Sequence, residues 1–301
     1  MILIGGKEVC VNGGLLKVGA LRAEQFDFVD DPKTALDELR QSGTPIDLFT
    51  FVQRVSDTLP RYPYPIEWDN FAGMPISTYE NWWSKQIDSK TRNMVRRAEK
   101  KGVEVREVAF DATLIHGIWK IYNEYPVRQG RRFVHYGKDF DTVQQEAATF
   151  LDRSMLLGAF HNGELIGFAK LTCDDTRAQA SVMNIITMIQ YRDKAPANAL
   201  VAQAVRSCAQ RDIPYFVYSR FAYGSKGVDG LAEFKRNNGF QQIDVPRYYI
   251  PLTPFGAIAF RLGLHKKLTD RLPRSVVTSL RDLRNAWYKR SLGVSDHETG
   301  R

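Results

Sequence analysis

Three strand-like segments follow one another between Ser154 and Gln190, and they constrain the fold more than any other feature of the chain. Their sequences are SMLLGAFHNG, ELIGFAKLTCDD and QASVMNIITMIQ. The first two meet at His161-Asn162-Gly163, a tight turn of the kind that closes a β-hairpin. Strands this close in sequence are usually neighbours in one sheet. The sequence therefore predicts a three-stranded meander at the centre of the fold.

Other elements surround this meander in a definite order. Before it we predict a strand at 103–110 and helices within 111–132 and 142–153. After it we predict a helix that begins near Pro196, a strand at 213–223, a helix that ends at Gly239 and a strand at 241–250. Upstream, the pattern predicts a hairpin at 7–23, a helix at 31–43, a strand at 45–55 and a proline-rich aromatic connector at 59–75.

A basic helix precedes the 103–110 strand. Ile87, Thr91, Val95 and Ala98 recur at helical spacing, and Gly102 stands where a left-handed C-cap belongs. The same segment is rich in Lys and Arg, which indicates either a solvated face or an anion-binding one. We expect three parts: a reduced N-terminal α/β lobe at 1–80, the main domain at 81–251 and a basic amphipathic helical tail at 252–301, broken at Pro273.

The composition limits the classes of partner that this chain is expected to bind. The chain has 301 residues and a formal net charge of +8, which favours an anionic partner such as a nucleotide-like cofactor, RNA or an acidic membrane surface. Three scattered cysteines and five histidines show no metal-ligand spacing, so we expect no metal and no disulfide framework. The N-terminus has no signal-peptide pattern and no segment has membrane-spanning length, so we expect a cytoplasmic protein.

The turn between the third meander strand and the next helix carries the functional argument. It reads Arg192-Asp193-Lys194-Ala195-Pro196-Ala197. Unpaired N–H groups and the positive end of the dipole at a helix start attract anions. Pro196 suits the first helical turn. We expect Ala195 to have a negative φ, because alanine disfavours a left-handed turn.

The order of elements and this turn resemble the GNAT acyltransferase superfamily. The resemblance implies an α/β (α+β) fold with a mixed, mostly antiparallel central sheet flanked by helices, and a turn that holds the pyrophosphate of coenzyme A. The family pattern there is roughly R/Q-x-x-G-x-G/A, and this chain has alanine at the first glycine. The implied acyl-CoA-binding residues are Met188, Ile189, Gln190, Arg192, Lys194, Ala195, Ala197 and Asn198.

A second resemblance is to the Fem-type peptidoglycan-bridge transferases and their acetyltransferase-like relatives. The segments TRNMVRRAEKKGVEVREV and LAEFKRNNGF carry it. Ordinary GNAT enzymes often have a tyrosine general acid where this chain has Lys235. The resemblance covers roughly residues 80–250, and the long helical hairpin with which Fem-type enzymes contact tRNA has no counterpart here.

The resemblance implies transfer of an acyl group from a thioester or an aminoacyl ester to an amine. We expect the backbone near Met188 and Ile189 to hold the thioester oxygen, between the parted strands NIITMIQ and YFVYSRF. Tyr218 and Tyr223 are candidate acids and Glu124 a candidate base, although packed rings and a surface carboxylate are alternatives.

We assign substrate binding to Asn184, Arg128 and Lys235; for Asn184, a polar residue in an apolar strand, a bulge is the alternative. The first functional hypothesis is N-acylation, from acyl-CoA, of an amine on a cell-envelope or sugar precursor, with the basic tail at the inner face of the membrane. The alternatives are an aminoacyl-tRNA-dependent bridge transferase and a non-catalytic binding protein of the same fold.

Overall fold

A computed structural model describes residues 2–128, 131–221 and 230–266. Its contacts divide the chain into two compact units. Among the described residues, unit 1 comprises 2–76, 173–181, 212–221 and 230–266, and unit 2 comprises 77–128, 131–172 and 182–211. The predicted division into 1–80, 81–251 and 252–301 stays a prediction. The tail from residue 267 onward, with its predicted break at Pro273, lies outside the described residues.

Unit 1 is built on a sheet whose strand order is β1-β2-β3-β4-β13-β5-β12, followed by the first residues of β11. Most neighbours are antiparallel, and β3–β4 and β12–β11 are parallel. Its strands are β1 (Ile2–Ile4), β2 (Lys7–Asn12), β3 (Val18–Leu21), β4 (Leu48–Val52), β5 (Ile66–Pro75), β12 (Tyr215–Arg220) and β13 (Gln241–Pro251). Its helices are α1 (Pro32–Gln41), α7 (Gly230–Asn237) and α8 (Pro254–Arg261).

The predicted connector at 59–75 is wrong over its second half, because residues 66–75 form β5. Proline, aromatic and acidic residues hide the strand locally, but β5 pairs with β13 along its length, from Gln241↔Gly73 to Tyr248↔Ile66. Gly73 permits this pairing, since a Cβ there would lie 2.4 Å from the side chain of Ile243. A long-range partner therefore decides the conformation of this segment.

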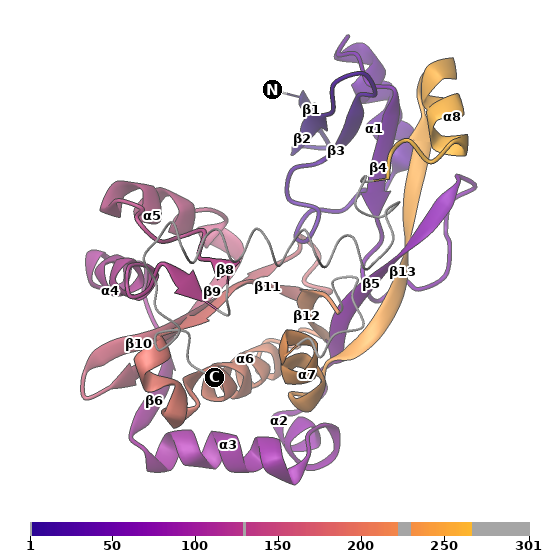
Figure 1. Ribbon diagram of the computed structural model, residues 1–301. Coiled ribbons are helices and arrows are strands. Elements are labelled where there is room, and N and C mark those ends of the chain that lie inside the picture. Colours follow the sequence, from indigo (N-terminus) through magenta and orange to yellow (C-terminus); the bar gives the residue numbers. More distant parts are fainter. Residues whose placement is uncertain (1, 129–130, 222–229, 267–301) are drawn as a thin grey trace. The chain divides into compact units, whose positions relative to one another are not determined.

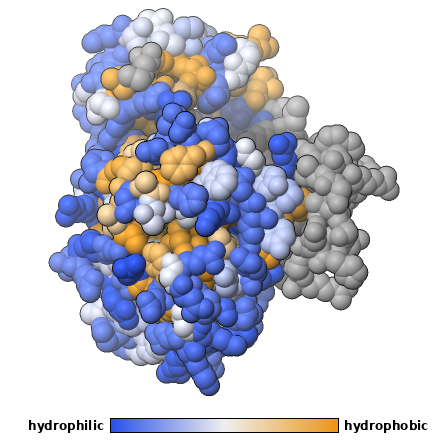
Figure 2. Space-filling view, turned by 90° about the vertical axis from the view of Figure 1, so that its left-hand side faces the viewer, coloured by the Kyte–Doolittle hydropathy of each residue, from blue (hydrophilic) through white to orange (hydrophobic). Residues whose placement is uncertain are grey.

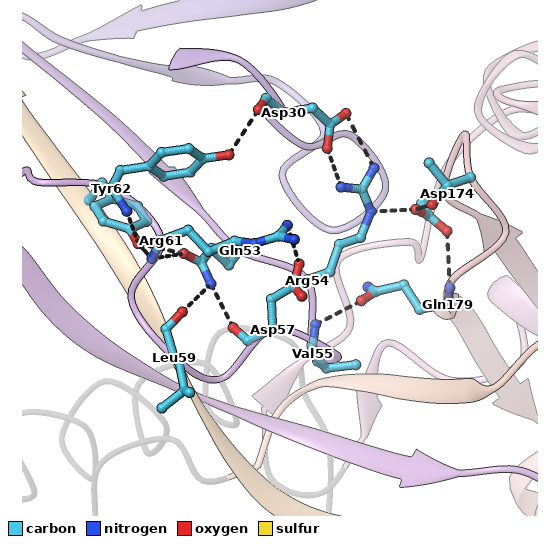
Figure 3. Close-up of polar contacts among 12 residues, drawn as sticks. Asp30, Gln53, Arg54, Val55, Asp57, Leu59, Arg61, Tyr62, Asp174 and Gln179 are labelled. Atoms are coloured by element: carbon cyan, nitrogen blue, oxygen red, sulfur yellow. Dashed lines mark hydrogen bonds and ion pairs between the residues drawn. The ribbon is translucent and has the colours of Figure 1, made fainter. Parts of the chain in front are cut away.

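A buried ion cluster ties residues 173–181 to the rest of unit 1 (Figure 3). The Arg54 guanidinium donates to the buried carboxylate of Asp174 at 2.6 Å and pairs with Asp30. The backbone N–H of Val55 donates to the side chain of Gln179 at 3.0 Å. Burial opposes the charge of Arg54, but the bonds to Asp30 and Asp174 outweigh it and raise the pKa of Arg54. These contacts explain why residues 173–181 belong to unit 1.

Unit 2 contains the strand order β11-β10-β9-β6, with helices on both faces. In Figure 1, α4 and α5 lie on one side of these strands and α6, backed by α3, lies on the other. The strands are β6 (Val103–Glu107), β9 (Ser154–His161), β10 (Glu164–Cys173), β11 (Ala180–Thr187), and a small hairpin of β7 (Val127–Arg128) and β8 (Arg131–Arg132). The helices are α2 (Tyr79–Asn81), the π-helical η1 (Trp82–Gln86), α3 (Ser89–Lys100), α4 (Ala112–Tyr122), α5 (Phe140–Ala147), the 3₁₀ turns η2 (Leu151–Arg153) and η3 (Ile189–Lys194), and α6 (Pro196–Ala209).

The predicted meander and the basic helix are both present. The hairpin between β9 and β10 pairs His161 with Glu164, as the turn residues predict. Asp88 caps α3 through its side chain, and Gly102 has a φ of +73° just after the helix. The core between α4 and the strands contains Ile115, Leu156 and Phe168. The expected mixed α/β fold with a mostly antiparallel sheet flanked by helices is therefore confirmed.

Candidate functional site

In the turn after β11, Ala195 adopts the left-handed backbone conformation that glycine adopts readily. Ala195 has φ +55° and ψ +42°, so the expectation of a negative φ is wrong. The chain must reverse between η3 and α6, and Ala195, buried at this corner, accepts a conformation that costs about 1–2 kcal/mol for a residue with a Cβ. Pro196 starts α6 as predicted.

The start of α6 has no side-chain cap. The N–H groups of Asn198 and Ala199 donate to the Ala195 carbonyl at 3.2 and 3.4 Å. For the N–H of Ala197, no acceptor is found within the described part of the chain. The turn also carries the side chains of Arg192, which is exposed, and Lys194, which is partly exposed. A left-handed residue followed by an uncapped helix start is a geometry that suits an anionic group.

The donors expected to hold a thioester oxygen already have intramolecular acceptors. The N–H of Met188 donates to the Ile166 carbonyl at 2.7 Å. The N–H groups of Ile189 and Gln190 donate to the two oxygens of the Glu124 carboxylate at 2.7 and 3.0 Å. The turn therefore binds a carboxylate in this state, and that carboxylate belongs to the chain itself. A role for Glu124 as base requires it to leave Ile189.

Arg128 holds Glu124 in this position. Its guanidinium pairs with Glu124 at 3.2 Å and donates to the carbonyls of Thr187 and Ile121 at 2.7 and 2.6 Å. It also stacks on the ring of Phe133, with its Cζ 4.3 Å from the ring centroid. Burial lowers the pKa of Arg128, and the Glu124 charge opposes that shift. Here Arg128 joins the end of α4 to the end of β11; its assignment to substrate stays a prediction.

A cavity of about 190 Å³ lies in unit 2 between α4, α5 and the strands. It contains Asn184, one of the predicted substrate-binding residues. Its walls are formed by Phe110, Leu114, Ile118, Tyr122, His135, Glu146, Ala147, Leu156, Phe168, Lys170, Met183 and Asn184. Sequence reasoning singled out Asn184 as a polar residue in an apolar strand, and the same signal at Lys170, within ELIGFAKLTC, would have found a second wall residue.

The charged groups at this cavity are satisfied by protein partners. The ammonium of Lys170, which is 1% exposed, donates to the carbonyls of Ala147, the last residue of α5, and Thr149, two residues further on. Burial lowers the pKa of Lys170 to about 8. Glu146 accepts from Lys138 at 2.5 Å. The groups that the cavity can offer to a ligand are therefore mainly neutral, because its charged side chains are already paired.

Tyr218 and Lys235 lie in unit 1. Lys235 is fully buried, donates to the Arg220 carbonyl, and places its Nζ 4.7 Å from the centre of the Tyr218 ring. Tyr218 also meets Phe240 edge-on at 5.7 Å between ring centroids. Tyr223, the other candidate acid, lies outside the described residues. The ladder between β11 and β12 covers Ala180↔Phe216 and Ser181↔Val217, and β11 passes from unit 1 to unit 2 directly afterwards.

A basic face covers α3 and the segment before it, and we call it the α3 face. It consists of exposed cations that have no ion pair within the described ranges: Lys85, Lys90, Arg97, Lys100 and Lys101. Beside it, Arg96 lies over the ring of Trp83 at 5.4 Å and Arg206 over that of Tyr79 at 4.4 Å. The lower part of Figure 2, where α3 lies in Figure 1, is predominantly hydrophilic.

Within 2–128, 131–221 and 230–266, three or more His, Cys, Asp or Glu side chains nowhere gather as a metal site. In the same ranges, no helix has the length and apolarity needed to cross a bilayer.

Comparison with solved structures identifies the fold. FemX superposes with a TM-score of 0.54 at 10% identity, over 80% of this chain and 83% of that one. The lysylphosphatidylglycerol synthetase L-PGS from Bacillus licheniformis gives 0.53 at 13% identity, over 84% and 85%. The C-terminal domain of a putative lysylphosphatidylglycerol synthetase from Agrobacterium fabrum gives 0.52 at 13% identity, over 84% and 83%.

The chain has a GNAT-like fold. The predicted resemblance to the GNAT and Fem-type proteins is thereby confirmed at the level of fold, and identities this low support no more than that. No family model matches the sequence, and no curated protein matches it.

Proposed function

We propose that this protein is an acyltransferase that moves an acyl group from acyl-CoA to an amine. The observation that carries the proposal is the uncapped start of α6 after left-handed Ala195, which suits the pyrophosphate of coenzyme A. Lys194 and Arg192 would add positive charge beside it. One of the proteins with the same fold is named as a putative lysylphosphatidylglycerol synthetase, which indicates that it joins a lysyl group to a lipid.

The chemistry follows from the proposed donor. A neutral amine attacks the thioester carbonyl, an amide bond forms, the C–S bond breaks, and coenzyme A leaves as a thiolate that needs a proton. Glu124 is the proposed base, and Tyr218 or Tyr223 the proposed acid. When the donor binds, Glu124 would release the Ile189 N–H, which could then stabilise the oxyanion.

Binding of acetyl-CoA tests the donor. We expect acetyl-CoA to raise the melting temperature, because a ligand of the native state stabilises it. Lys194→Ala should weaken the affinity measured by calorimetry about tenfold, the loss of one charge-assisted contact. Lys120→Ala, an exposed lysine on α4, is the matched control. Equal affinities for Lys194→Ala and the unaltered protein would remove the assignment.

The proposed acceptor is an amine on a cell-envelope or sugar precursor. The basic tail, residues 252–301, is proposed to attach the protein to the inner, acidic face of the membrane. Sedimentation with vesicles of phosphatidylcholine, with and without phosphatidylglycerol, tests the attachment. Deletion of residues 267–301 should abolish the binding to the anionic vesicles, and retained binding would contradict the role of the tail.

A second candidate donor is aminoacyl-tRNA, and the α3 face favours it. Its five unpaired cations suit the phosphate backbone, and the Trp83 ring beside them suits stacking. The occupation of Ile189 and Gln190 by Glu124 also weakens the simplest acyl-CoA hypothesis. Transfer of a labelled amino acid from charged tRNA, with none from acyl-CoA, would establish this candidate.

Salt dependence provides the structural test of that donor. Replacing Arg97 and Lys101 by alanine should reduce the slope of log affinity against log salt by about 1.5–2. The double variant Lys33→Ala, Lys120→Ala removes the same charge elsewhere and should leave the slope unchanged. Absence of turnover with either donor would instead support a non-catalytic binding protein.

A further inference from the structure

The cavity in unit 2 contains two polar side chains that the protein leaves without partners. Tyr122 is 4% exposed, yet its hydroxyl has no hydrogen bond within the described residues. The side-chain amide of Asn184, which is partly buried, likewise has none there. Neither the Tyr122 hydroxyl nor the Asn184 amide is sealed from solvent, since the fully buried polar atoms without partners lie elsewhere in the described residues. Both groups border the cavity, so a ligand inside it can form a hydrogen bond with each.

The rest of the wall is mainly apolar. Leu114, Ile118, Leu156 and Phe168 contribute hydrocarbon from α4, β9 and β10. A dry engineered cavity of about 150 Å³ accepts benzene, so a volume of about 190 Å³ accepts a ring with a small substituent. The size therefore limits the ligand, or the part of a ligand that enters, to roughly ten non-hydrogen atoms.

The electrostatics of the cavity wall disfavour a charged ligand. Lys170 and Glu146 already have protein partners, as described above. His135 stacks on Tyr122 with 4.3 Å between ring centroids. Burial, together with the Lys138 charge, lowers the pKa of His135, so its ring is neutral near pH 7. A charged ligand would lose its hydration without gaining a free counter-charge.

We propose that this cavity is a binding site for a small uncharged ligand that has an aromatic or branched apolar body and one hydrogen-bonding group, such as a primary amide. The amide would accept from the Tyr122 hydroxyl and exchange hydrogen bonds with the Asn184 side chain, while the body packs against Phe168 and Ile118. The site involves neither the α6 turn nor the α3 face, so it does not depend on the donor proposed above.

Binding of benzamide tests the proposal, with benzoate and benzylammonium as charged analogues of the same shape. Calorimetry and ligand-observed NMR on the full chain, without acyl-CoA or RNA, should show benzamide binding at least tenfold tighter than either analogue. Tyr122→Phe and Asn184→Leu should each weaken benzamide binding about three- to tenfold. Tyr136→Phe removes an exposed hydroxyl outside the cavity and should leave the affinity unchanged.

Stability measurements keep the test independent of folding defects. Because the Tyr122 hydroxyl has no protein partner, Tyr122→Phe should melt at or above the temperature of the unaltered protein. No benzamide binding, equal binding of the charged analogues, or unchanged affinity in both cavity variants would overturn the proposal. None of these results bears on acetyl-CoA binding, so the two proposals fail separately.

Discussion

The Glu124 carboxylate accepts a hydrogen bond of 2.7 Å from the backbone N–H of Ile189, at the point where β11 ends. This contact places a side chain of the α4 end on a donor that the proposed reaction needs. Arg128 supports it through the ion pair with Glu124. The relationship makes Glu124 both the candidate base and the group that must move before a donor can enter.

Substitution of Glu124 separates these two roles. Glu124→Ala frees both N–H groups and should increase the affinity for acetyl-CoA several-fold while reducing turnover at least a hundredfold, the usual contribution of a general base. Glu124→Gln keeps the bond to Ile189 and should reduce turnover without that gain in affinity. Calorimetry and a thiol-release assay measure the two quantities. Unchanged turnover in both variants would contradict the catalytic role.

The left-handed Ala195 predicts an unusual order of stabilities. Ala195→Gly should change the free energy of unfolding by less than about 1 kcal/mol, because relief of backbone strain offsets the greater chain entropy. Ala195→Val should lower it by more than about 2 kcal/mol, since a β-branched residue disfavours positive φ. Ala197→Gly, inside α6, serves as the control and should destabilise by about 0.5–1 kcal/mol. Urea unfolding measures the series, and equal costs for Ala195→Gly and Ala195→Val would refute the assigned backbone.

We expect Lys235 to contribute to the free energy of unfolding. Lys235→Met keeps the stem but removes the donor to the Arg220 carbonyl, so we expect a loss of about 1–3 kcal/mol. Arg236→Met, an exposed neighbour, should cost under about 1 kcal/mol. A variant at Lys235 that keeps full stability but raises the acceptor KM would instead favour the predicted contact with substrate.

Lys170 should give unfolding a measurable pH dependence. Its pKa is about 8 in the folded protein and 10.5 in the unfolded chain, so the unfolded chain binds the extra proton between these values. Stability from this group is therefore constant below pH 8 and rises with pH up to about 10.5, by at most about 3 kcal/mol. The difference between the unaltered protein and Lys170→Met, followed by denaturant unfolding from pH 7 to 10.5, isolates this contribution. A flat difference would show that the carbonyls of Ala147 and Thr149 compensate for burial.

The ion cluster of unit 1 predicts a large asymmetry between buried and exposed pairs. Arg54→Met leaves Asp174 buried without its cation and should destabilise by about 3–5 kcal/mol. Arg40→Met breaks the exposed pair with Asp37 and should cost at most about 1 kcal/mol. Thermal and urea unfolding measure both variants. A cost for Arg54→Met as small as that for Arg40→Met would show that the buried pair contributes little.

Local sequence signals were reliable where the cause of structure is itself local. Gly102 ends α3 with a positive φ, Pro196 starts α6, and His161-Asn162-Gly163 closes a hairpin. Each of these effects depends on a few neighbouring residues, so they can be read directly from the chain. The order of these elements was enough to predict the GNAT-like fold.

Features that depend on the folded arrangement of several segments could not be predicted from the sequence. The strand β5 forms because β13 lies beside it, and Ala195 adopts a left-handed conformation because the chain must turn between η3 and α6. The predicted helical region from Asp111 to Arg132 instead ends at Tyr122, and a short hairpin follows. In each case the folded geometry overrides a local preference that is worth about 2 kcal/mol or less.

The sequence by itself determined the hairpin of β9 and β10, the basic character of α3 and the start of α6 at Pro196, because these depend on spacing, charge and capping within one segment. Only the tertiary structure decided that Glu124 occupies the donors of Ile189 and Gln190, that Lys235 is buried, and that Tyr122 and Asn184 share a cavity. Glu124 and the two donors that it occupies are 65 and 66 positions apart in the sequence, so this burial and hydrogen bonding exist only once the chain has folded.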